Sequence, residues 1–61
     1  MIDQILESYS DEVQHFKAGG DLNYDLESAL WEYYFNKGII KNYDADASGF
    51  ISENLADYLG L

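Results

Sequence analysis

The clearest helical pattern in the chain lies at residues 2–17, IDQILESYSDEVQHFK. At 100° per residue the apolar side chains fall within a stripe about 100° wide, which is typical of a helix packed on one side. The stripe consists of Ile2, Ile5, Leu6, Tyr9, Val13 and Phe16. Lys17 suits the negative end of the helix dipole, and Gly19 or Gly20 can supply the left-handed residue that ends a helix. We therefore predict one continuous helix over 2–17.

A second helix, predicted over 22–37, is apolar on two sides. Asp21 or Asn23 can cap its start. One face carries Leu22, Leu26, Ala29, Leu30 and Tyr33, and a roughly opposite face carries Tyr24, Trp31, Tyr34 and Phe35. A helix that is apolar nearly all round is either central in its domain or faces a partner. Because so small a chain has little else to cover both faces, we expect the aromatic face to be semi-exposed and to bind a partner protein or a second copy.

The C-terminal third predicts a short helix over 52–59, capped by Ser52. Residues 39–51 can extend the second helix, form a hairpin that pairs 39–43 with 49–52, or form a loop. The acids and the glycine of 43–51 favour an Asp-rich loop and turn. The predicted fold is all-α, with three helices in a single domain over 1–61.

The amino-acid composition argues against several classes of function. The 61 residues include twelve acids, three lysines, no arginine and no cysteine, for a net charge of −9. The hydrophobic content of 48% and the ten aromatic residues favour a folded chain over a disordered acidic tail. A domain this small has little core volume for an enzyme pocket, so we expect no catalysis. No apolar run approaches 18 residues and no basic segment opens the chain, which predicts neither a membrane span nor a signal peptide and favours the cytoplasm.

The charge also bears on the partner. Nucleic-acid binding draws on lysine and arginine, so we expect no direct binding to DNA or RNA and instead a protein partner with a basic surface. Carboxylates four residues apart on a helix are spaced about 6 Å along its axis, about half as dense as the phosphates of one DNA strand. Candidate rows are Asp3, Glu7 and Asp11 on the first helix and Asp21, Asp25 and Glu32 on the second. In small size and acidity the chain is similar to the DNA-mimic inhibitors of phages and mobile elements. Plain solvated faces, or a small subunit of a larger complex, are the alternatives.

Residues 44–52, DADASGFIS, resemble the first nine positions of an EF-hand calcium loop. That loop takes oxygen ligands at positions 1, 3 and 5, a glycine at 6 and a backbone carbonyl at 7. The matching residues are Asp44, Asp46, Ser48, Gly49 and Phe50. Position 12, a bidentate glutamate in the family, is Leu55 here. The resemblance implies a degenerate calcium module as an alternative function. The other interpretation is an Asp-rich turn with Gly49 at positive φ, and no other cofactor is expected.

Overall fold

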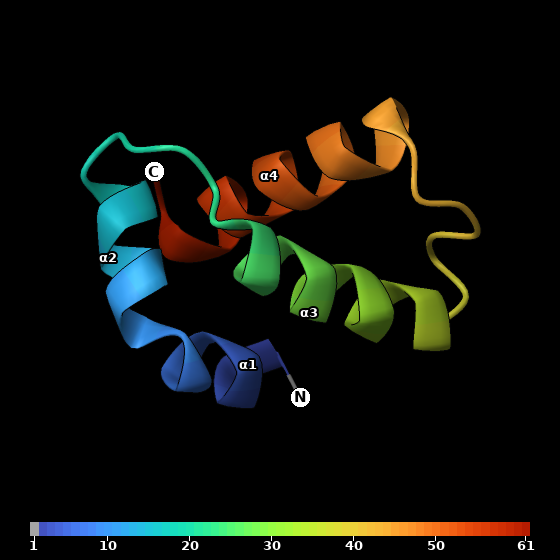
Figure 1. Ribbon diagram of the computed structural model, residues 1–61, viewed down its shortest axis with the longest axis horizontal. Coiled ribbons are helices and arrows are strands. Elements are labelled where there is room, and N and C mark those ends of the chain that lie inside the picture. Colours follow the sequence, from blue (N-terminus) through green and yellow to red (C-terminus); the bar gives the residue numbers. More distant parts are fainter. Residues whose placement is uncertain (1) are drawn as a thin grey trace.

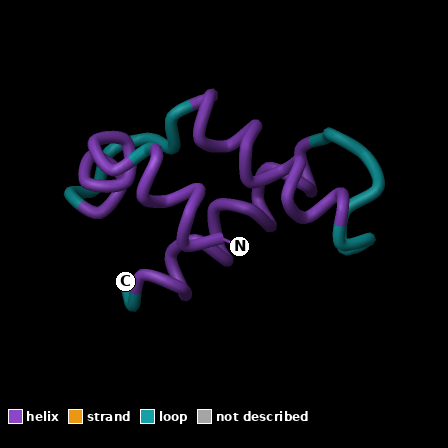
Figure 2. The backbone as a smooth tube through the Cα atoms, turned by 90° about the horizontal axis from the view of Figure 1, so that it is seen from below, coloured by secondary structure: helices purple, strands orange, loops and turns teal. Residues whose placement is uncertain are grey.

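The computed structural model describes residues 2–61 and consists of four helices (Figure 1). These are α1 (Ile2–Ser8), α2 (Ser10–Lys17), α3 (Tyr24–Asn36) and α4 (Ala45–Leu59). The predicted all-helical class is confirmed, and the predicted count of three helices is wrong. Helix α3 contacts both α1 and α4 and lies between them. The two longer loops, 18–23 and 37–44, lie at opposite ends of the molecule (Figure 2).

A bend at Tyr9 divides the predicted first helix into α1 and α2. Tyr9 has φ −119° and ψ 39°, which is outside the helical region. Hydrogen bonds still cross the bend, because the Tyr9 amide donates to the Ile5 carbonyl at 3.2 Å and the Val13 amide donates to the Tyr9 carbonyl at 2.9 Å. The apolar stripe therefore continues while the axis turns. A straight 16-residue helix would extend about 24 Å, whereas the bent one brings both Leu6 and Val13 into the same core.

Helix α3 begins with a side-chain cap that was one of the two predicted. The Asn23 side chain accepts a hydrogen bond from the Leu26 amide at 3.1 Å. The helix ends at Asn36, where Gly38 at φ 76° adopts the left-handed conformation that stops it. Residues 39–44 then lead to α4 without a strand, so among residues 2–61 neither the hairpin nor an extension of α3 is formed.

Helix α4 begins seven residues earlier than predicted. The Asp44 side chain caps it by accepting from the Ala47 amide at 2.9 Å, and Ser52 lies in the helix interior. Ala47, Ile51 and Leu55 are all buried and follow one another at four-residue intervals, so they make one packed face. The predicted Asp-rich loop at 43–51 and the predicted start at Ser52 are therefore wrong. Burial of this face outweighs the low helix propensity of Gly49, which is helical and not at positive φ.

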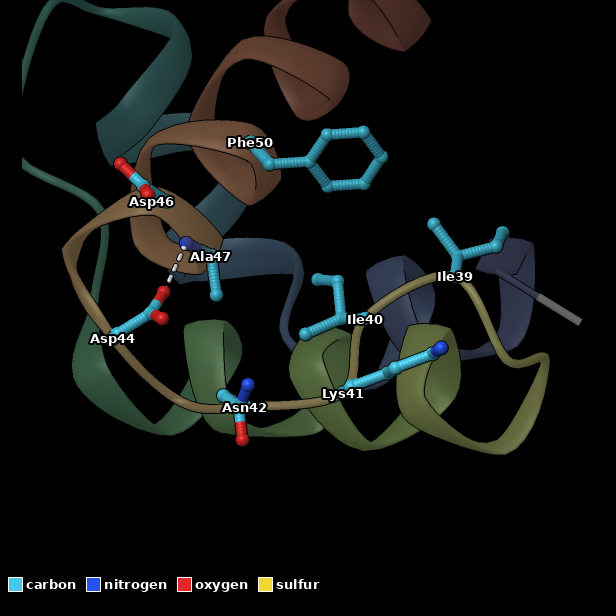
Figure 3. A pocket seen from close by; sticks show the side chains of 8 residues that line it. All are labelled: Ile39, Ile40, Lys41, Asn42, Asp44, Asp46, Ala47 and Phe50. Carbon is cyan, nitrogen blue, oxygen red and sulfur yellow. Dashed lines mark hydrogen bonds between the residues drawn. The ribbon is translucent and has the colours of Figure 1, made fainter.

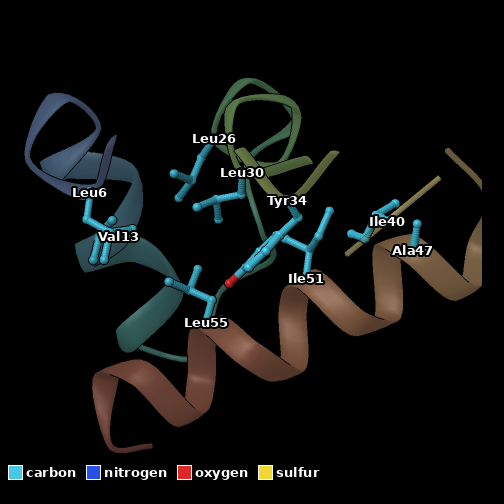
Figure 4. Close-up of a cluster of buried hydrophobic side chains, with 9 residues drawn as sticks. All are labelled: Leu6, Val13, Leu26, Leu30, Tyr34, Ile40, Ala47, Ile51 and Leu55. Carbon is cyan, nitrogen blue, oxygen red and sulfur yellow. The ribbon is translucent and has the colours of Figure 1, made fainter. Parts of the chain in front are cut away.

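The core collects side chains from all four helices and from the loop before α4 (Figure 4). Its buried members are Leu6, Val13, Leu26, Leu30, Tyr34, Ile40, Ala47, Ile51 and Leu55. No charged side chain among residues 2–61 is buried. Tyr34 was predicted to lie on the semi-exposed aromatic face, but it is only 8% exposed and its ring packs edge-on against Phe50 at 5.5 Å.

Replacing Gly49 with alanine should stabilise the protein. Gly49 is exposed within α4, and an added Cβ would meet no atom within 4 Å. Because glycine in a helix interior is less favourable than alanine by about 0.5–1 kcal/mol, Gly49→Ala should raise the free energy of unfolding in urea by about that amount. Gly60→Ala is the control and should lower it, since Gly60 sits at φ 76°. A loss of stability in Gly49→Ala would contradict the helical start of α4.

Candidate docking surface

Four aromatic side chains form an exposed surface along the outer side of α3. Tyr24, Trp31 and Phe35 lie on one side of the helix, and Tyr43 joins them from the loop before α4; we call these four residues the aromatic surface. Tyr24 is 71%, Tyr43 47% and Phe35 46% exposed, and Trp31 is half-buried. Three of the four residues predicted for this face are therefore present. Tyr43 takes the place of Tyr34, and no helical periodicity could have indicated it, because Tyr43 lies outside the helix.

Three of the four rings of the aromatic surface are in contact through Trp31. Trp31 stacks on Phe35, with ring centres 4.9 Å apart and planes inclined by 22°. On its other side Trp31 contacts Tyr43 at 5.6 Å and 47°. Contacts of this kind hold aromatic side chains in defined orientations. A partner would thus meet Trp31, Phe35 and Tyr43 as one cluster of rings, with Tyr24 about two helical turns before Trp31 on the same side of α3.

Hydrogen bonds fix the loop that carries Tyr43. The Trp31 indole Nε1 donates to the Asn42 carbonyl at 3.1 Å. The Tyr43 hydroxyl donates to one carboxylate oxygen of Glu27, and the Ser48 hydroxyl donates to the other oxygen at 2.7 Å. Glu27 therefore joins α3, the loop and α4 at one point. A surface that is ordered before binding loses less conformational entropy when a partner docks.

The hydrogen bond to Glu27 also changes the pKa of the Tyr43 hydroxyl. It raises the pKa of Tyr43 from 10.0 to about 12, with smaller contributions from burial and from the nearby Glu27 charge. Burial, with a contribution from Tyr33, raises the pKa of Tyr34. A raised tyrosine pKa means that the fold favours the neutral hydroxyl. Its contribution to stability is fully present below pH 10 and is lost as the pH rises from 10 towards about 12.

A tyrosine titration should detect this bond. In a spectrophotometric titration of tyrosinate, Tyr43→Phe should remove one hydroxyl from the late part of the curve and leave Tyr34 there. Glu27→Gln keeps an acceptor but removes the charge, so the Tyr43 pKa should move back towards 10. An unchanged late part of the curve in both variants would show that the Tyr43 hydroxyl does not bond to Glu27 in solution.

Carboxylates flank the aromatic surface on α3. By helix geometry Asp25 and Glu32 lie about 80–100° around the axis from Tyr24. Both are exposed, as is Asp21 in the segment before the helix. Asp25 and Glu32 therefore lie along one edge of the aromatic surface, about a quarter-turn of α3 away from Tyr24. Ten of the twelve acids are exposed, Glu12 and Glu27 being partly buried.

The other predicted acidic row does not run straight. Asp3 and Glu7 lie on α1, while Asp11 lies on α2 beyond the bend at Tyr9. All three side chains are exposed. The axial spacing of about 6 Å holds only within an unbroken helix, so it applies to Asp3 and Glu7 and not to the step to Asp11.

The EF-hand-like segment does not form a calcium loop. Asp44 is the cap of α4, and Asp46, Ser48 and Phe50 lie within the helix, where the Ser48 hydroxyl already donates to Glu27. The Phe50 carbonyl accepts from the Asn54 side chain at 2.8 Å. An EF-hand loop instead wraps its oxygens around one ion. Within residues 2–61 no three acidic, histidine or cysteine side chains are grouped so that they could hold a metal ion.

Two open depressions lie on the surface of the described residues. One, of about 320 Å³, lies between α1 and α3 and is lined by Ile5, Ala29, Glu32, Tyr33 and Asn36. The other, of about 310 Å³, lies between the 39–44 segment and the start of α4 (Figure 3). Glu32 borders the first depression and also flanks the aromatic surface.

Comparison with protein-family models, with curated proteins and with solved structures finds no match to this chain. None of the helices within residues 2–61 has both the length and the apolarity to cross a membrane.

Proposed function

We propose that this chain is a non-enzymatic docking protein that binds a basic surface of a partner protein and thereby inhibits or modulates the partner. The observation that carries the proposal is the aromatic surface, in which Trp31 is stacked and hydrogen-bonded in place while Tyr24, Phe35 and Tyr43 stay exposed. Tryptophan and tyrosine dominate the residues that supply binding energy at protein interfaces. In this proposal the aromatic surface is the centre of the interface.

The flanking charge determines the kind of partner. Asp25 and Glu32 border the aromatic surface, and the whole chain carries a net charge of −9 with only three lysines. Such a field attracts a basic surface at long range and increases the association rate, while it repels nucleic acids. The rings then supply the affinity that persists once the two proteins are in contact. A cytoplasmic protein partner fits these two roles, in which the charge speeds association and the rings supply the affinity.

In its more specific form the proposal places the partner's basic surface in a nucleic-acid-binding groove. Ten exposed carboxylates distributed over the fold support this charge mimicry of DNA. The bend at Tyr9 changes how it would work. Because the acids do not lie on one straight line, they would imitate the DNA phosphates as a curved distribution of negative charge and not as a regularly spaced row. Affinity capture distinguishes this form of the proposal from binding to a partner that has no such groove and from binding to a second copy of this chain.

Affinity capture tests the proposal. The immobilised protein should retain a basic partner from a lysate of its own cells at low salt and release it along a salt gradient. Neutralising the flank with Asp25→Asn and Glu32→Gln should move release to lower salt. The matched control, Glu53→Gln with Asp57→Asn, makes the same change of charge on the exposed side of α4 and should have a smaller effect.

Added duplex DNA distinguishes the two forms of the proposal. Competition by DNA supports a nucleic-acid-binding groove, and its absence limits the proposal to another basic surface. Release that does not depend on salt, with both double variants behaving like the original protein, would contradict the role of charge. Retention of the chain itself as the only bound protein would contradict the partner proposal and indicate a homodimer.

A further inference from the structure

The depression between the 39–44 segment and α4 is chemically divided along its length. Its apolar end consists of Ile39 and Phe50, which are 54% and 36% exposed, above a floor of buried Ile40 and Ala47. In Figure 3 the Phe50 ring points towards the side on which Ile39 lies. Ile39 and Phe50 thus remain in contact with water, next to two side chains that are already buried.

The other end of the depression is acidic. Asp44 and Asp46 lie there, on the first residues of α4 and its cap. The single lysine of the lining, Lys41, extends its amine towards the Ile39 end and away from these carboxylates (Figure 3). The cap bond uses Oδ1 of Asp44, and a carboxylate has a second oxygen that can accept from a cation. The acidic end is therefore available to a basic side chain.

Internal contacts hold the two ends in position. The Asp44 cap fixes the start of α4, and the Phe50 ring rests edge-on against Tyr34 of the core at 5.5 Å. Asp46 and Phe50 are four residues apart on α4 and so are separated by about 6 Å along its axis, with the carboxylate and the ring extending towards opposite ends of the depression (Figure 3). In an extended peptide, side chains two residues apart point the same way and are separated by about 6.6 Å. The two spacings match.

We propose that this depression binds an extended segment of a protein partner in which a lysine or arginine is followed, two residues later, by a leucine or isoleucine. The basic side chain pairs with Asp44 and Asp46, and the aliphatic side chain covers Ile39 and Phe50. Charge complementarity and the matching spacing select this occupant over an acidic peptide or a nucleic acid. None of the lining residues belongs to the aromatic surface, so this second contact does not depend on the proposed function.

A short synthetic peptide tests the site. Acetyl-Gly-Arg-Ser-Leu-Gly-amide, titrated into the ¹⁵N-labelled protein at low salt, should produce saturable shifts in the amide resonances of residues 39–50. Three control peptides change one feature each: Glu for Arg, Ala for Leu, and Arg-Leu-Ser for Arg-Ser-Leu. Each should bind at least about fivefold more weakly, because a charge pair, a buried aliphatic group or the spacing is lost.

Variants of the protein locate the contact. Asp46→Asn and Ile39→Ser should each weaken the peptide at least about threefold, while the matched controls Glu53→Gln and Tyr58→Ser on α4 should not. Tyr24→Ala removes an exposed ring of the aromatic surface but keeps the Trp31 bond to the loop, so it should leave peptide binding unchanged and separate this site from the aromatic surface. Shifts confined to Tyr24, Trp31 and Phe35, equal affinity for all four peptides, or no saturable shift would each overturn the proposal.

Discussion

Replacing Trp31 with alanine should weaken partner binding by about 30-fold or more. That factor corresponds to about 2 kcal/mol, the lower limit for residues that dominate an interface. The indole lies between Phe35 and Tyr43 and bonds to the Asn42 carbonyl. Its removal therefore takes away a contact ring and also frees the loop that presents Tyr43. Both effects should lower the affinity. Titration calorimetry with the partner recovered from the salt gradient measures this affinity.

Two controls separate these effects from a general loss of aromatic surface. Trp31→Phe keeps a ring that can stack on Phe35 but removes the donor to Asn42, so its affinity should lie between those of the original protein and Trp31→Ala. Tyr58→Ala removes a ring that is 50% exposed on α4, and it should leave affinity within about twofold. If Trp31→Ala and Tyr58→Ala lose affinity equally, the aromatic surface is not the centre of the interface.

Replacing Leu30 with alanine should destabilise the protein strongly. Leu30 is 0% exposed and lies in α3, the helix that contacts both α1 and α4. Truncating a fully buried leucine costs about 2–5 kcal/mol. A chain of this length is expected to have a total stability of only about 3–9 kcal/mol. We therefore expect a marked drop in the urea midpoint, and partial unfolding in water if the cost reaches the upper end.

Circular dichroism during urea unfolding measures this loss. Leu61→Ala is the control, because Leu61 is 60% exposed and surface substitutions change stability by about 0.5 kcal/mol or less. An effect of Leu30→Ala as small as that of Leu61→Ala would contradict the placement of α3 at the centre of the core.

Helical periodicity predicted the helices that pack on one side but missed where one of them bends. The stripe from Ile2 to Phe16 is continuous in both the prediction and the structure. A stripe shows only that side chains share a face, and Tyr9 can leave the helical region without taking its neighbours out of that stripe. The turn depends on the shape of the core that Leu6 and Val13 reach together, and this shape is not a local property of the sequence.

The start of α4 was missed because local signals conflict with packing. Asp44, Gly49 and Ser52 are all typical of loops and turns. Ala47 and Ile51 continue the buried face of Leu55, and this burial decides the outcome. The alanines between the acids carried the relevant signal, since alanine favours helix.

The aromatic surface shows the same limit. Periodicity places Tyr34 with Tyr24, Trp31 and Phe35, and the small size of the chain predicts that this face is semi-exposed. The additional turns of α4 bring Phe50 against Tyr34 and bury it, and the loop that leads into these turns carries Tyr43 to Trp31. Tyr24, Trp31 and Phe35 were predictable from α3 alone, whereas Tyr43 required the tertiary structure.

The most direct test of the docking proposal uses the fact that Trp31 is the only tryptophan in the chain. The protein can be labelled with 5-fluorotryptophan, so that its ¹⁹F spectrum reports on this one side chain when the captured partner is added. The proposal predicts that the resonance shifts and that its H₂O-to-D₂O isotope shift decreases as the ring is shielded from solvent. A resonance that keeps its position and its solvent isotope shift in a stable complex would contradict docking through the aromatic surface.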